Sequence, residues 1–362
     1  MWRSGITPDG VNESVAPQSV PISRAAVAVL LAVSVGCVLL LLSWHWSSRG
    51  LQFACDNVLG SVLPKHGCTA GVGKAFTYSW ALAFLPIMLL LERWRPADPN
   101  QPVFSPGLLV DSLWFLAFPV LGIWLPDAFE RLLNTSFGSA LAGFRLHALT
   151  TLPLYVQLLL VILVADFLAW FGHLVRHKIP VLWEFHKIHH SQVQLNYFST
   201  RRLHPLDLFA QSLVRFLPWT LLGMSVALPA FLIWTTFLRL FEMFVHANFR
   251  TNLGVLRYVF VTPQTHRIHH SMRPEHIDKN FGDFLSIWDF IFRTQWMDFN
   301  VYPALGVHDQ KCPQGMASTI GGAVRVVLLE LVYPLRAVGS MLFKDRGVPV
   351  STEKKAASEA SV

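Results

Sequence analysis

The chain has 362 residues, of which 53% are hydrophobic and 14% are charged, and it contains 27 Phe and 13 Trp. Soluble domains carry about 25% charged residues, so this composition argues against a soluble globule and predicts a surface that faces lipid. The net charge of +7 comes from basic residues in short stretches beside apolar runs, which indicates membrane anchoring and argues against nucleic-acid binding. Four cysteines are too few for a disulfide scaffold, and no Cys-x-x-Cys pair is present to hold zinc.

Five apolar stretches approach the length that a membrane-spanning helix requires, about 20 residues. They cover residues 25–48, 75–91, 108–125, 148–165 and 216–238. We interpret the first as a retained anchor, because it is longer than the apolar part of a signal peptide and no small cleavage-site residues follow it. The third carries Asp111 near one end, where a carboxylate is tolerated beside the headgroups. Pro218 and Pro229 lie in the fifth and predict a bent hairpin that enters and leaves on one side.

Basic residues in the short loops set the expected orientation. Arg93 and Arg95 follow the second stretch and several more basic residues follow the fourth, so both of these ends should be cytoplasmic. The segment between Cys55 and Cys68 would then lie outside, where the two cysteines could form a disulfide. The stretch 320–339 is apolar but carries three charged residues, which is typical of a helix that lies in the membrane interface.

Three histidine motifs follow the fourth apolar stretch. They are His173-x-x-x-His177, His186-x-x-His189-His190 and His266-x-x-His269-His270. Residues three and four apart share a helix face, so we expect the imidazoles within each motif to converge. A single histidine beside a membrane is usually an interfacial side chain or a core group. Two copies of one pattern beside a third motif are poorly explained by chance, and they predict a metal site.

The number and type of ligands restrict the metal. Structural zinc takes four ligands, usually with thiolates among them, whereas eight or more imidazoles exceed the needs of one zinc ion and no cysteine is nearby. Two metal ions are therefore implied. Imidazole suits iron, copper, nickel and zinc alike, so the residues leave the element open. The membrane context and the excess of ligands favour two irons that act on dioxygen.

These motifs, in this order, resemble those of the membrane fatty acid hydroxylase and sterol desaturase superfamily. The supporting matches are Asp166, Arg202-Leu-His204-Pro, His246-Ala-Asn248, Asp278-Lys-Asn280-Phe-Gly282 and Trp288-Asp289. The likeness covers a little over a third of the chain. Two positions depart from the family pattern: Leu174 stands where arginine is frequent, and Arg293 stands where glycine is frequent.

The resemblance implies a helical membrane enzyme that uses two irons, O2 and two external electrons to hydroxylate or desaturate a lipid. The metal ligands that it implies are His173, His177, His186, His189, His190, His266, His269 and His270, with His246 as a ninth. The residues that it suggests for completing or orienting this shell are Asp166, His204, Glu242, Asn248, Asp278 and Asn280. A simpler interpretation of Glu242 is an ion pair with Arg239, three residues back.

Electrons must come from elsewhere, because the chain has no Gly-x-Gly-x-x-Gly motif and no complete phosphate-binding loop. A separate reductase with a ferredoxin or a b-type cytochrome is therefore implied. The lipid remains open among sterols, fatty acyl chains, ether lipids and carotenoids. A competing interpretation is a membrane metal or haem carrier without oxygenase activity. Carriers normally place ionisable ligands inside their spans, whereas these histidines follow the apolar runs.

Together the patterns predict an all-α integral membrane protein with about four transmembrane helices, a bent helical hairpin and a cytoplasmic histidine-rich cap that binds metal. The expected organisation is a polar segment at 1–24, transmembrane segments at 25–147, a fatty acid hydroxylase-like catalytic domain at 148–300, an interfacial helix region at 301–343 and a disordered tail at 344–362. The expected location is a multi-pass position in a membrane, with the metal site on the cytoplasmic side.

Overall fold

The structure is a computed structural model that describes residues 65–118, 132, 135–136, 151–211, 214 and 228–343. Its helices are α2 (Lys65–Trp94), α4 (Leu154–Lys178), α5 (Pro180–His190), α7 (Leu228–His246), α8 (Pro263–His269), α9 (Ile287–Ile291) and α10 (Ile320–Phe343), with short 3-10 turns η3 (Ser199–Arg201), η4 (Gly254–Tyr258) and η5 (Pro274–His276). An unlabelled helix covers Pro106–Phe118. The described residues form isolated bridges but no strand, as an all-α prediction requires.

The helices follow the predicted apolar stretches, with different limits. α2 begins at Lys65, ahead of the stretch 75–91, and contains Cys68. α4 begins at Leu154 and runs beyond the stretch 148–165 to Lys178. The stretch 25–48, Cys55, the first half of the expected hairpin and the tail 344–362 lie outside the described residues.

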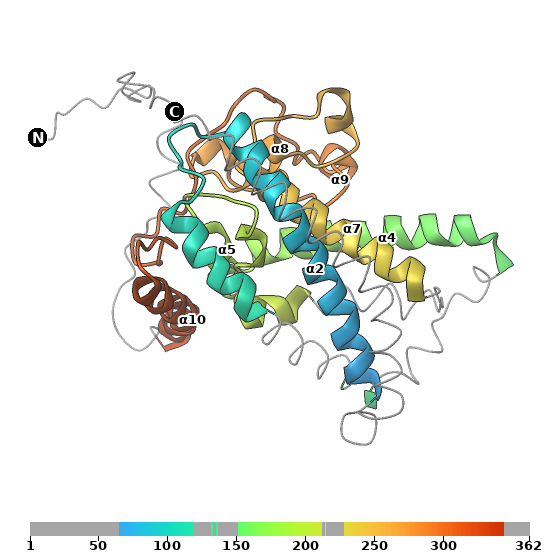
Figure 1. The fold of residues 1–362 in the computed structure, drawn as a ribbon, viewed down its shortest axis with the longest axis horizontal. Coiled ribbons are helices and arrows are strands. Elements are labelled where there is room, and N and C mark those ends of the chain that lie inside the picture. Colours follow the sequence, from blue (N-terminus) through green and yellow to red (C-terminus); the bar gives the residue numbers. More distant parts are fainter. Residues whose placement is uncertain are drawn as a thin grey trace, which may run out of the picture.

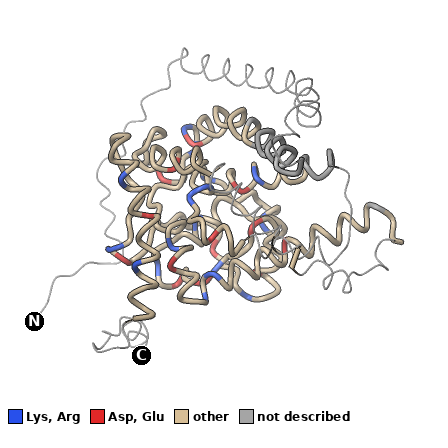
Figure 2. The backbone as a smooth tube through the Cα atoms, turned by 90° about the horizontal axis from the view of Figure 1, so that it is seen from below, with Lys and Arg blue, Asp and Glu red and all other residues tan. Residues whose placement is uncertain are grey.

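Two helices, Tyr155–Lys178 and Ile320–Phe343, are long and apolar enough to cross a membrane. The first half of α4 has no charged residue before Asp166, and in Figure 2 it extends as a tan segment away from the part that carries the charges. α10 includes the stretch that we expected in the interface, and it meets the same length and composition criterion as α4.

α4 and α5 form a tight helical corner. Ile179 adopts an extended conformation before Pro180, which has no N–H and occupies the first turn of α5. The two helices pack on one another, and α2 packs on α7 across the front of the molecule (Figure 1). The last turns of α4, α5 and α7 therefore meet α8 in one region.

A buried polar network anchors this region to α10. Arg202 donates to Asp111 at 3.5 Å and also pairs with Glu330, and all three side chains are fully buried. Asp111 accepts further hydrogen bonds from Gln192, Asn196 and Ser199. These donors satisfy the carboxylate of Asp111 inside the protein, so its burial does not depend on lipid headgroups. Glu330, which we expected to interrupt an interfacial helix, is likewise an internal partner.

Candidate metal centre

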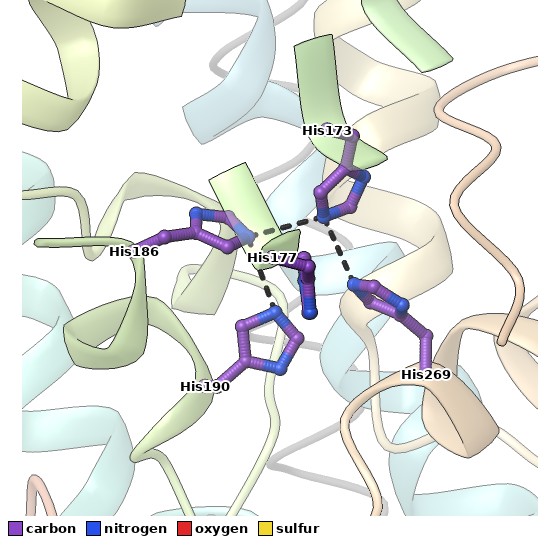
Figure 3. Close-up of side chains that lie close together, drawn as sticks. All are labelled: His173, His177, His186, His190 and His269. Atoms are coloured by element: carbon purple, nitrogen blue, oxygen red, sulfur yellow. Dashed lines mark hydrogen bonds between the residues drawn. The ribbon is translucent and has the colours of Figure 1, made fainter. Parts of the chain in front are cut away.

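The nine predicted histidine ligands lie together in two groups. The first contains His173, His177, His186, His190 and His269, and the second contains His189, His246, His266 and His270. Within each group the possible ligand atoms all lie within 4.8 Å of one another. Figure 3 shows the five imidazoles of the first group pointing toward a common centre, with His177 between the other rings.

Each His-x-x-His-His motif is divided between the two groups. His186 and His190 of α5 belong to the first group, whereas His189 belongs to the second. The motif of α8 is divided in the opposite way. His269 belongs to the first group, whereas His266 and His270 belong to the second. Neighbouring residues on a helix point about 100° apart, so adjacent imidazoles diverge. The expectation that all three converge is therefore wrong.

The spacing of the ring nitrogens tests whether a metal ion fits. Within the groups, six Nε2–Nε2 contacts measure 2.9–3.2 Å. A metal about 2.1 Å from two cis ligands separates their nitrogens by about 3.0 Å, whereas tetrahedral geometry gives about 3.4 Å. The observed spacing is therefore close to that of nitrogens that share one metal ion.

Backbone carbonyls fix the orientation and tautomer of three rings. Nδ1 of His173 donates to the carbonyl of Phe281 at 3.0 Å, and Nδ1 of His269 donates to the carbonyl of Lys279 at 2.8 Å. Nδ1 of His246 donates to its own helix, at the carbonyl four residues back, over 2.6 Å. A carbonyl only accepts, so each Nδ1 carries the hydrogen and each Nε2 keeps its lone pair for a metal.

A carboxylate orients His186 in the same way. Asp207 Oδ2 lies 3.1 Å from Nδ1 of this ring, and Asp207 also pairs with Arg176 at 3.4 Å. All three side chains are buried. A carboxylate behind a metal-binding histidine raises the basicity of the ring and holds its direction, so Asp207 completes the support of the first group.

Burial keeps the cluster neutral. It lowers the pKa of His189, His266 and His270 well below the usual value for imidazole. It also lowers the pKa of His246 and His269 to about 4. At neutral pH these rings are therefore uncharged, which is the form that binds metal.

Several buried ring nitrogens have no hydrogen-bond partner among the described residues. Nε2 of His177 is one, and it belongs to the first group. Nδ1 of His189, His266 and His270 are the others, all in the second group. An unsatisfied buried nitrogen is costly, and coordination of a metal ion by Nε2 of His177 would remove that cost.

The six residues suggested as supports lie around the cluster without touching its ring nitrogens through their side chains. Asp166 accepts from Trp288 Nε1 at 2.9 Å, so it fastens α4 to the chain near α9. Nε2 of His204 bonds the carbonyl of Leu331 in α10 at 3.1 Å. The carboxylate of Glu242 pairs with Arg239 at 2.7 Å, which confirms the simpler interpretation.

The other three suggested residues brace the backbone. Asn248 bonds the main chain of Asp98, and Asp278 forms an ion pair with Lys178 at the end of α4. Asn280 Nδ2 donates to the carbonyl of Thr265 in α8 at 2.8 Å. Asn280 and Asp278 both have positive φ, so this turn brings the carbonyls that hold the rings into place.

Sequence reasoning did not identify two groups that support the site. Asp207 lies 21 residues after His186, so no helical spacing relates the two and the sequence did not indicate that they are in contact. The sequence identified Asp289 only as part of the Trp-Asp match. In the structure its carboxylate accepts hydrogen bonds from Trp170 Nε1, from the backbone N–H groups of Phe281 and Gly282, and from a threonine hydroxyl. It therefore holds the segment whose carbonyl binds His173.

A cavity of about 470 Å³, including space at its mouth, adjoins both histidine groups. Its described lining includes five of the imidazoles, namely His173, His186, His189, His246 and His266. Three arginines, Arg176, Arg201 and Arg239, and the carboxylates of Glu242 and Asp283 complete its charged lining. A small molecule in this cavity would therefore reach the metal centre and meet a strongly polar wall.

The fold and the site define a helical protein with a buried cluster of histidines that could hold metal, beside a candidate membrane span. Residues 158–294 match the profile of the fatty acid hydroxylase family, so this part of the chain carries a fatty acid hydroxylase domain. The matched range lies inside the predicted catalytic domain at 148–300. No solved structure matches the chain.

Characterised relatives share this domain. An ornithine lipid hydroxylase of Rhizobium tropici is 32% identical over 142 residues, which cover 39% of this chain and 42% of the relative. Human alkylglycerol monooxygenase is 30% identical over 193 residues, 52% of this chain and 41% of the relative. A Delta(7)-sterol 5(6)-desaturase of Gibberella zeae is 28% identical over 150 residues, 40% of each chain. The matches thus span less than half of each of these relatives.

Proposed function

We propose that this protein is a membrane oxygenase that uses O2 and two external electrons to hydroxylate or desaturate a lipid. The observation that carries the proposal is the pair of buried, neutral histidine groups inside the matched domain. The names of the relatives support it, because they describe hydroxylation, monooxygenation and desaturation of lipids.

We propose one iron in each group. The ligands would be the five imidazoles of the first group and the four of the second. Two irons, when bound, would supply the redox chemistry that attack on an unactivated C–H bond requires and that zinc lacks.

Residues of this chain orient the imidazoles of the proposed metal site. The carbonyls of Lys279 and Phe281, together with Asp207, hold three rings of the first group so that their Nε2 atoms face the centre. His173 and His177 lie in the last turns of α4, at the end of a candidate membrane span. A lipid whose chain remains in the bilayer could therefore present a carbon to the cavity beside the metal centre.

The remaining parts of the proposal come from the sequence. The metal centre would face the cytoplasm in a multi-pass membrane protein, and the catalytic domain would occupy 148–300. A separate reductase with a ferredoxin or a b-type cytochrome would deliver electrons. The nature of the lipid and the choice between hydroxylation and desaturation depend on cavity shape, which the histidine motifs leave open.

Metal content and Mössbauer spectroscopy of the purified protein, produced with labelled iron, test the proposal. We expect about two irons per chain with the signal of a coupled pair, and oxidation of added lipid when reductant and O2 are supplied. Zinc alone, with no iron after anaerobic reconstitution, would contradict the oxygenase proposal and support the metal carrier instead.

A further inference from the structure

The cavity beside the metal centre contains a buried arginine without a counter-ion. Arg201, in η3, is 5% exposed, and its guanidinium has no hydrogen bond or ion pair with any residue that the structure describes. Its flat face lies over the ring of Phe118, 5.0 Å from the ring centre. Stacking of this kind leaves the N–H groups at the edge of the guanidinium available to an acceptor.

The other two arginines of the cavity are already paired with carboxylates. Arg239 pairs with Glu242 at 2.7 Å, and Arg176 pairs with Asp207 at 3.4 Å. Asp283 lies 3.3 Å from Nδ1 of His173, on the wall beside the first group. Buried charges are normally paired because desolvation is costly, so the unmatched charge of Arg201 points to a partner that comes from outside the chain.

A guanidinium presents parallel N–H groups that can bind two oxygens of one phosphate or carboxylate group. We propose that Arg201 binds a phosphate or carboxylate group on the headgroup of the lipid substrate. This inference rests on the proposed oxygenase function and narrows its substrate class to anionic lipids. Because Arg201 lines the same cavity as imidazoles of both groups, a headgroup held there presents a nearby carbon, rather than the far end of the chain, to the metal centre.

Binding measured in neutral detergent tests this inference without turnover. The full chain is titrated calorimetrically with hexadecyl phosphate and with hexadecanol, which share one alkyl chain and differ in the charge of the headgroup. We expect hexadecyl phosphate to bind at least about tenfold more tightly, because its charged oxygens can accept hydrogen bonds from the buried guanidinium and the hydroxyl of hexadecanol carries no charge. Equal affinity of the two ligands for the wild-type protein would overturn the inference.

Variants assign the preference to one side chain. Arg201→Gln should remove most of the preference for the phosphate headgroup while the affinity for hexadecanol stays the same, and Arg201→Lys should retain part of it. Arg325→Gln, at an exposed position on α10, controls for general attraction between anions and a basic surface. A preference that survives in Arg201→Gln, or that disappears in Arg325→Gln, would contradict the assignment.

Inorganic phosphate distinguishes a headgroup from a free anion. We expect millimolar inorganic phosphate to give no Arg201-dependent binding, because the alkyl chain contributes to the affinity. Binding of inorganic phosphate as tight as that of hexadecyl phosphate would overturn the headgroup assignment. The oxygenase proposal is judged separately by iron content, so a protein with iron and no headgroup preference would refute only this inference.

Discussion

The carbonyl oxygen of Phe281 lies 3.0 Å from Nδ1 of His173, although 108 residues separate them in the chain. The N–H of Phe281 in turn donates to Asp289 Oδ1 at 2.8 Å. A loop held by one buried carboxylate thus sets the direction of an imidazole on α4. The arrangement of the histidine cluster therefore depends on groups that are not themselves part of it.

Asp289→Asn tests this support. An amide presents N–H groups to the N–H donors that the carboxylate now accepts, so we expect the free energy of unfolding to fall by about 1–3 kcal/mol. Iron affinity should weaken by about 10–100-fold, as is usual when the support of a ligand is lost. Thermal unfolding and iron titration measure both effects. Asp298→Asn, at an exposed turn, is the matched control, and unchanged iron affinity in Asp289→Asn would contradict the role.

The two groups should respond separately to loss of a ligand. His269→Ala removes a ring from the first group and His189→Ala removes one from the second. We expect each variant to hold about one iron per chain, to lose turnover and to insert into membranes normally. Metal analysis and activity assays check this. Retention of wild-type turnover in either variant would show that the replaced histidine is not a ligand.

Asp207→Asn should affect the first group selectively. Arg176 also donates to the Asp207 side chain, so an amide that turns its oxygen toward Arg176 presents its NH2 group to Nδ1 of His186 and no longer fixes the tautomer of the ring. We expect the first group to bind iron about 10–100-fold more weakly while the second retains its metal. Spectroscopic resolution of the two irons would reveal this difference. Equal weakening at both groups would indicate general destabilisation instead, and Glu275→Gln, at an exposed site, should change neither.

Acid should destabilise the metal-free protein over a defined range. The folded-state pKa values of His246 and His269 are about 4, below the usual value near 6.5, so the unfolded chain binds more protons between these limits. The stabilisation is therefore fully present above about pH 6.5 and is lost as the pH falls toward 4. Melting temperatures of chelator-treated protein should decline through this range. A constant melting temperature down to pH 4 would argue against buried, neutral rings.

Arg293→Gly should stabilise the protein. Arg293 has φ +58°, a left-handed conformation that costs a non-glycine residue about 1–2 kcal/mol. Glycine also increases the conformational entropy of the unfolded chain, which destabilises the folded protein by about 0.4–1 kcal/mol. We therefore expect the free energy of unfolding to rise by about 0.5–1 kcal/mol in total. Arg273→Gly, at φ −66°, should destabilise by a similar amount. Denaturant unfolding compares the two, and the same sign in both would contradict this explanation.

The sequence by itself determined the histidine motifs, the apolar stretches and the class of protein. These features are local, because helical spacing and hydrophobic runs depend only on neighbours along the chain. The nine histidines were therefore identifiable before any contact was known. The Arg239–Glu242 pair was predictable for the same reason, since its members lie three residues apart on α7.

Only the tertiary structure decided which imidazoles share a centre. His189 and His190 are adjacent in sequence but belong to different groups, because neighbouring helix positions point in different directions and the partners arrive from other helices. The tertiary structure also placed Asp111 in a buried network and left Arg201 without a counter-ion beside the cluster. Such contacts join residues far apart in the chain, and the packing that creates them leaves no periodic signal in the sequence.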